Sequence, residues 1–224
     1  MSHFETSIAY NESRICDEAG HTVVERRKLA PAPAVHTISG EEYIQRVAIL
    51  VDGWNLLKAA DRLKRRVNLA ELAHGALAHS PDRYIAFQRF YIGPNSGLGA
   101  AQRVERLAEE ARSLGHEWVQ CSTEGAYPKT VVDAHIIMDI LTWSYCHSVD
   151  VIALYSGDGD YAEAARRARA LGLRVEVYAI KASHHLSTAL EHSANSTHDL
   201  EALGALHPGS DPADELYASD STEA

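Results

Sequence analysis

The chain has 224 residues, of which 46% are hydrophobic and 23% are charged, an ordinary balance for a globular protein and enough for one domain of about 150 residues with extensions. The formal net charge of −10 excludes a protein that covers nucleic acid with a globally basic surface, but not one whose acids are concentrated at a metal site. The three cysteines form no zinc-ligand spacing or disulfide framework, the first residues lack the features of a secretory signal, and no apolar run is long enough to span a membrane, so we expect a cytoplasmic protein.

Residues 1–45 are interpreted as an N-terminal arm and linker, separate from the core. Two apolar stretches, 7–10 and 22–25, flank a polar segment from Asn11 to Gly20, a pattern that favours a hairpin with a long loop. The Pro- and Ala-rich stretch 29–35 is typical of an extended linker, because each proline fixes φ and removes an amide donor. Two interpretations stay open: an unstructured tail, or an ordered arm that covers the domain or a partner subunit and so supports a homo-oligomer.

The core begins at residue 46 and alternates strand-like with helix-like segments. Apolar runs predict strands over residues 47–51, 84–92, 117–121, 149–155 and 173–179. Helical spacing predicts helices over residues 56–65, 68–79, 100–114, 130–147 and 160–171, with one or two short helices within 183–206. The alternation predicts a three-layer α/β domain over residues 46–206, with a mainly parallel sheet of five strands flanked by helices. The acidic tail, residues 207–224, is expected to be disordered.

Carboxylates occupy the turns that follow two of the predicted strands. Asp52 follows the strand 47–51, while Asp158 and Asp160 lie in the turn Ser-Gly-Asp-Gly-Asp-Tyr at residues 156–161. Because α/β folds place their sites at the carboxyl ends of the strands, we expect these acids to meet around a divalent metal. Crowding of the carboxylates favours binding of a cation, because two unscreened carboxylates ~4 Å apart repel each other by roughly 4 kcal/mol at an effective dielectric of ~20. A helix cap for Asp52 or Asp160, and a structural turn for Asp158, are the alternatives.

Residues 49–56, Ile-Leu-Val-Asp-Gly-Trp-Asn-Leu, place the pattern Asp-Gly-x-Asn directly after an apolar strand. Together with the two motifs that follow, this stretch resembles the NYN domain family, the LabA-like branch of the PIN-like nuclease superfamily, whose domain opens with DGxN after an apolar strand. Residues 132–139, Val-Asp-Ala-His-Ile-Ile-Met-Asp, resemble its VD-x5-D helix start. The Ser-Gly-Asp-Gly-Asp-Tyr turn and the strand that follows it, residues 171–177, resemble its SGDxDF/Y turn and LG-x-x-V-x-V strand. Order and spacing agree over roughly residues 46–203, a domain-sized span.

The resemblance implies a PIN-like fold and a metal-dependent phosphodiesterase that acts on RNA. Carried over position by position, it implies a catalytic and metal-binding cluster of Asp52, Asp133, Asp158 and Asp160, with Asn55 as a polar helper. Mg²⁺ or Mn²⁺ would neutralise the phosphodiester and lower the pKa of the attacking water, so that no protein general base is required. Two positions differ from the family pattern: Thr130 stands where a lysine is common, with Lys129 one position earlier, and Asn195 rather than Asp follows Ala194.

Other residues are weaker candidates for the same site. Asp139 lies six residues after Asp133, about 120° around a helix, so the two cannot both point at one ion, and we interpret Asp139 as supporting the site or the fold. The candidates for contact with RNA phosphates are Lys129, Thr130, Ser156, Arg62 and Arg65. For each of these, capping a helix or facing solvent is the simpler interpretation.

The leading hypothesis is therefore a Mg²⁺- or Mn²⁺-dependent ribonuclease with RNA as its partner. The alternative is a catalytically weak or inactive module that binds RNA or regulates through protein interactions; the acidic balance favours it, and the full set of four acids argues against it. A phosphohydrolase for small phosphate esters is a third hypothesis, but the D-x-D-x-[TV] nucleophile motif is missing. The sequence also has no G-x-S-x-G elbow, P-loop or dinucleotide fingerprint.

Overall fold

The computed structural model describes residues 10–16, 22–28, 44–93, 100–121, 128–184 and 186–209. The chain divides into two compact units, residues 1–43 and 44–224. In the first unit, β1 (Tyr10–Cys16) and β2 (Thr22–Lys28) pair antiparallel. The predicted hairpin is present, but β1 occupies residues that we assigned to its loop, because a polar strand carries no hydrophobic pattern. The linker 29–35 and the tail from residue 210 lie outside the described residues.

The main sheet has six parallel strands in the order β6-β5-β3-β7-β8-β9. Their bounds are Gln45–Asp52 for β3, Arg83–Ile92 for β5, Glu117–Gln120 for β6, Val151–Tyr155 for β7, Arg174–Ala179 for β8 and Ser196–Asp199 for β9. The prediction of a mainly parallel sheet is confirmed, and the prediction of five strands is wrong by one. The additional strand, β9, is polar and lies at the sheet edge, inside a segment that we expected to be helical.

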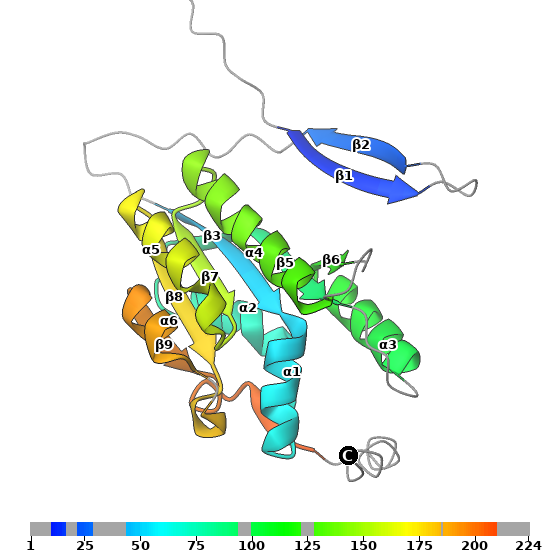
Figure 1. The fold of residues 1–224 in the computed structure, drawn as a ribbon, viewed down its shortest axis with the longest axis vertical. Helices are drawn as coiled ribbons and strands as arrows, with labels where there is room; N and C mark the ends of the chain where they lie inside the picture. The colour runs from blue at the N-terminus through cyan, green and yellow to red at the C-terminus, as the bar shows by residue number, and fades with distance from the viewer. Residues whose placement is uncertain are drawn as a thin grey trace, which may run out of the picture. The chain divides into compact units, whose positions relative to one another are not determined.

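Helices cover both faces of this sheet (Figure 1). One face packs against α4 (Pro128–Tyr145), α5 (Ala162–Ala170) and α6 (Thr188–Ser193), and the other against α1 (Gly53–Arg62), α2 (Ala70–Leu77) and α3 (Ala100–Ser113). The central strand β3 shows why the core has two halves. Its Ala48 and Leu50 pack toward α4, while Val47, Ile49 and Val51 pack toward α1 and α2, as the alternation of side chains along a strand requires. The predicted three-layer α/β architecture is confirmed.

Several element boundaries differ from the prediction for local reasons. The helix α1 begins at Gly53, three residues earlier than expected, because Oδ1 of Asp52 accepts the Asn55 amide at 3.2 Å and caps the helix. The helix α4 begins at Pro128, so Thr130 lies inside its first turn and is not its cap. Two short strands, β4 (Arg65–Val67) and β10 (Leu206–Pro208), pair antiparallel, so residues 207 and 208 are not part of a disordered tail. None of the described helices has the length and apolar character needed to cross a membrane.

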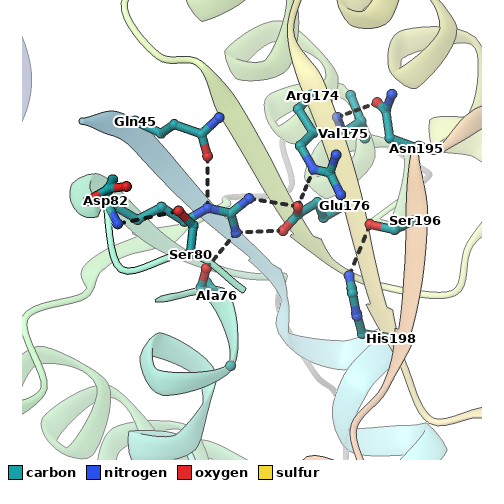
Figure 2. A network of polar contacts seen from close by, with 12 residues as sticks. Gln45, Ala76, Ser80, Asp82, Arg174, Val175, Glu176, Asn195, Ser196 and His198 are labelled. Atoms are coloured by element: carbon teal, nitrogen blue, oxygen red, sulfur yellow. Dashed lines mark hydrogen bonds and ion pairs between the residues drawn. The ribbon is translucent and has the colours of Figure 1, made fainter. Parts of the chain in front are cut away.

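A buried ion pair fastens the amino-terminal edge of the sheet. Arg83, at the start of β5, donates to Glu176 of β8 through Nη1 at 3.0 Å and Nη2 at 2.9 Å, with the two side chains 3% and 0% exposed. Figure 2 shows Glu176 with Arg174, which also donates to it. Burial acts to raise the pKa of Glu176, but hydrogen bonds from Arg83 and Arg174 outweigh it and lower the pKa to about 2. Glu176 is therefore a charged group inside the core.

Candidate functional site

The two acid-bearing turns meet at the carboxyl edge of the sheet, opposite the Arg83–Glu176 pair. The strands β3 and β7 are neighbours, with Val51 in register with Tyr155, so the turns after them lie side by side. Oδ1 of Asn55 accepts the amide of Gly157 at 2.9 Å and ties one turn to the other. The carboxamide of Asn55 therefore holds the two turns in register, and the helper role that the resemblance implies for it stays a prediction.

Two glycines permit the close packing of these turns. A Cβ on Gly53 would lie 2.4 Å from the Phe90 ring and 2.8 Å from the carbonyl oxygen of Tyr91. A Cβ on Gly159 would lie 2.7 Å from Oγ of Ser187. The glycine of the first motif is thus required because β3 enters α1 directly against the backbone of β5.

Asp52 lies at the centre of the site and is only 5% exposed. Its Oδ2 accepts hydrogen bonds from the hydroxyl of Tyr161 at 2.8 Å and from that of Ser156 at 3.3 Å. Burial is the main cause that raises the pKa of Asp52 to about 6; the hydrogen bonds oppose the rise, while the charges of Asp133 and Asp158 add to it. The carboxylate is therefore expensive to ionise in the metal-free protein, and a nearby cation would relieve that cost.

Tyr161 joins Asp52 to Asp133. Its side chain is fully buried, and its hydroxyl lies 2.8 Å from Oδ2 of Asp52 and 2.9 Å from Oδ1 of Asp133, which belongs to α4. Burial and the two carboxylates raise the pKa of the Tyr161 phenol far above its usual range, so the group stays protonated. We did not select Tyr161 from the sequence. The sequence feature that could have identified it is its position at the end of the acid-bearing turn Ser-Gly-Asp-Gly-Asp-Tyr, where a tyrosine brings a hydroxyl group close to the acids.

The other predicted acids differ in their relation to Asp52. Asp158 is partly exposed, its charge affects Asp52, and its amide donates to Oγ of Ser156 at 3.2 Å. Asp160 is exposed, and its amide donates to Oδ1 of Asp158 at 3.1 Å. Asp139 accepts hydrogen bonds from Arg89, at 2.7 Å, and from Tyr91. The structure therefore places Asp52 and Asp133 on one hydroxyl, with Asp158 within electrostatic range of Asp52, leaves Asp160 at the surface, and pairs Asp139 with an arginine.

The residues predicted to contact RNA phosphates lie at different distances from Asp52. Ser156 is buried and bridges Asp52 to the Asp158 amide, so it supports the turn from within. Arg62 ends α1, a helix of ten residues and so about 15 Å long, and Arg65 follows in β4 and pairs with Glu201 at 3.7 Å. These two arginines lie at the far end of α1 from Asp52, so any contact they make with RNA phosphates would be away from the acids, and that contact stays a prediction. Lys129 and Thr130 lie in the first turn of α4, and their side chains are outside the described part of the structure.

The acids are suited to a hard divalent ion, although they do not form a closed cage. Within the described residues, no three His, Cys, Asp or Glu side chains form a group that could hold a metal. Mg²⁺, however, binds through one or two carboxylates and keeps several waters, which the pair Asp52 and Asp133 satisfies. The nearby Cys121 is buried, and burial together with the charges of Asp52, Asp133 and Asp139 raises its pKa to about 11. A hard ion such as Mg²⁺ prefers oxygen donors to a protonated thiol, and the carboxylates of Asp52 and Asp133 supply them.

Comparisons with known proteins agree with this architecture. The sequence matches the family model of the NYN domain over residues 46–201. A crystal structure of a protein of unknown function from Vibrio parahaemolyticus RIMD 2210633 has a TM-score of 0.58 and 19% sequence identity, covering 75% of this chain and 99% of that one. A search of curated proteins gave no match. At this level of identity, the likeness to the solved structure shows the fold.

Proposed function

Because the chain belongs to the NYN domain family, within the PIN-like nuclease superfamily, we propose that it is a metal-dependent ribonuclease that hydrolyses RNA phosphodiester bonds at the carboxyl edge of its sheet. One observation carries the proposal: the buried Asp52 and the partly buried Asp133, from elements far apart in the sequence, converge on a single hydroxyl, with Asp158 within electrostatic range of Asp52. Acids that only capped helices would not need to be gathered in this way.

In this proposal, Asp52 and Asp133 hold Mg²⁺ or Mn²⁺, with Asp158 at the rim. The ion, when bound, supplies positive charge to the phosphodiester and lowers the pKa of the attacking water. The protein orients these acids: the hydroxyls of Ser156 and Tyr161 hold Oδ2 of Asp52, and Asn55 fixes the two turns. The exposed Asp160 faces the solvent from which RNA approaches.

The test is cleavage of labelled single-stranded and hairpin RNA by the full chain in Mn²⁺, Mg²⁺ or EDTA. We expect cleavage that needs the metal and is lost in Asp133→Asn and Asp158→Asn, because both substitutions remove a negative charge from beside Asp52. Asp160→Asn is the matched control, and it should retain most of the activity because Asp160 is exposed and contributes its backbone amide to the turn. Undiminished cleavage in EDTA, or by a folded Asp133→Asn variant, would contradict the proposal.

A second candidate function is an inactive module that binds RNA or regulates through protein contacts. The observation that favours it is the lack, within the described ranges, of three side chains grouped as metal ligands. The melting temperature distinguishes the two candidates when it is measured beside cleavage. If Mn²⁺ raises the melting temperature but RNA stays intact, the acids bind cations without catalysis, and the second candidate is preferred.

A further inference from the structure

Tyr161 makes a contact that its role in the core does not explain. Its ring packs in the apolar cluster on the α4 face, which accounts for the burial of the aromatic body. Its hydroxyl, however, is placed between Oδ2 of Asp52 and Oδ1 of Asp133, at 2.8 and 2.9 Å. A phenol carries one hydrogen, so it can donate to only one of these carboxylates at a time. The hydroxyl therefore joins the two acids, donating to one carboxylate while the other lies within hydrogen-bond distance of the same phenol oxygen.

We propose that Tyr161 is a positioning residue that sets the spacing of Asp52 and Asp133 and thereby the affinity of the site for a divalent ion. This inference rests on the proposed function, because it assumes that the two acids hold the metal. The packed ring fixes the position of the hydroxyl, and the hydroxyl fixes the carboxylate oxygens. A group that orients metal ligands from behind typically changes metal affinity 10- to 100-fold when it is removed.

The two acids and the tyrosine belong to three separate elements. Asp52 ends β3, Asp133 lies in the second turn of α4, and Tyr161 ends the short helix η1 (Gly159–Tyr161). Apolar packing holds these three elements in one core, but it does not act directly on their polar groups. The hydroxyl of Tyr161 bridges the strand to the helix at the atoms that would bind the ion. Without it, the packing of backbone elements alone would set the gap between the two carboxylates.

Tyr91 provides a matched control inside the same protein. It is also fully buried, and its hydroxyl also donates to a carboxylate of α4, that of Asp139. That carboxylate is paired with Arg89 at 2.7 Å and has no place in the proposed metal site. Removing either hydroxyl deletes a buried hydrogen bond to an acid, but only Tyr161→Phe removes one between the proposed ligands.

The test is calorimetric titration of Mn²⁺ into the full chain as wild type, Tyr161→Phe and Tyr91→Phe. We expect Tyr161→Phe to bind Mn²⁺ 10- to 100-fold more weakly and Tyr91→Phe to bind within about twofold of wild type. Urea unfolding in EDTA should stay cooperative for both variants. In RNA cleavage, Tyr161→Phe should need more Mn²⁺ for half-maximal rate, while the rate at saturating Mn²⁺ approaches that of wild type.

Several outcomes would overturn the inference. Unchanged Mn²⁺ affinity in folded Tyr161→Phe, or equal weakening in both variants, would show that the hydroxyl does not set the site. Loss of cooperative unfolding in Tyr161→Phe would assign it a purely structural role. Failure of the wild type to bind Mn²⁺ would overturn the proposed metal site as well, and this outcome is distinguishable because it appears without any substitution.

Discussion

The substitution Glu176→Gln tests the energetics of the buried ion pair at the amino-terminal edge of the sheet. It keeps the shape of the side chain but removes its charge. Arg83, 3% exposed, would remain in the core without its counter-charge. One of the two oxygens that accept hydrogen bonds from Arg83 would also become a donor amide, so that two donors would face each other.

The expected loss of stability at pH 7 is about 3–5 kcal/mol, the range for breaking a buried ion pair. The pKa of Glu176 gives a consistent figure. It falls from 4.5 to about 2 in the folded protein, and at about 1.4 kcal/mol per pKa unit this corresponds to roughly 3 kcal/mol. Because the folded pKa lies below the unfolded one, this stabilisation is fully present above pH 4.5 and is lost as the pH falls toward 2.

Urea denaturation followed by circular dichroism at pH 7 and at pH 3 measures this effect. The gap between wild type and Glu176→Gln should be largest at pH 7 and smaller at pH 3. Arg174→Gln is the control: it removes another partner of Glu176, but that side chain is 46% exposed, so its loss should cost far less. A Glu176→Gln variant as stable as wild type at pH 7, or a gap that does not change with pH, would refute the reasoning.

Two further predictions concern the carboxyl edge. In EDTA, the stability of wild type relative to Asp52→Asn should fall by up to about 3 kcal/mol as the pH rises from 4 to 7.5, because the pKa of Asp52 rises from 3.8 to about 6 on folding and ionisation of the buried carboxyl costs stability; urea denaturation at both pH values measures this, and a difference between the two proteins that does not change with pH would contradict the prediction. Gly53→Ala should lower the unfolding free energy by about 1–3 kcal/mol, because the new Cβ meets the Phe90 ring and the backbone of β5; a melting temperature equal to that of wild type would contradict the close approach.

The parts of the fold that the sequence predicted are those where burial leaves a strong pattern. Residues 47–51 and 151–155 are fully buried, so their strands are continuous apolar runs. The edge strand β9, Ser196–Asp199, has four polar residues of intermediate exposure. It is held by backbone pairing with β8, which composition does not reveal, and we therefore expected a helix there.

The site was partly predictable for a similar reason. Sheet geometry places the turns after β3 and β7 together, which led to Asp52 and Asp158 from sequence position alone. The bridging role of Tyr161 depends on how α4 packs over the sheet, and no local pattern encodes the distance from its hydroxyl to Asp133. The exposure of Asp160 follows from the tight helix η1, which Asp158 caps; the sequence had suggested the capping role for Asp160 and a structural turn for Asp158. That an ion binds there stays a prediction.

The long sequence separations within the site have a consequence for synthesis and folding. Asp52 belongs to the first strand of the main sheet, yet the hydroxyls that contact its Oδ2 belong to residues 104 and 109 positions later. Contacts of such separation form late and slowly, because a large loop must close before they contribute. A nascent chain that has emerged only as far as α4 therefore carries Asp52 and Asp133 without Tyr161, Ser156 or β7 to gather them. The acids are therefore gathered only after β7 and η1 have joined the sheet, and a chain truncated after α4 carries Asp52 and Asp133 without the hydroxyls that contact them.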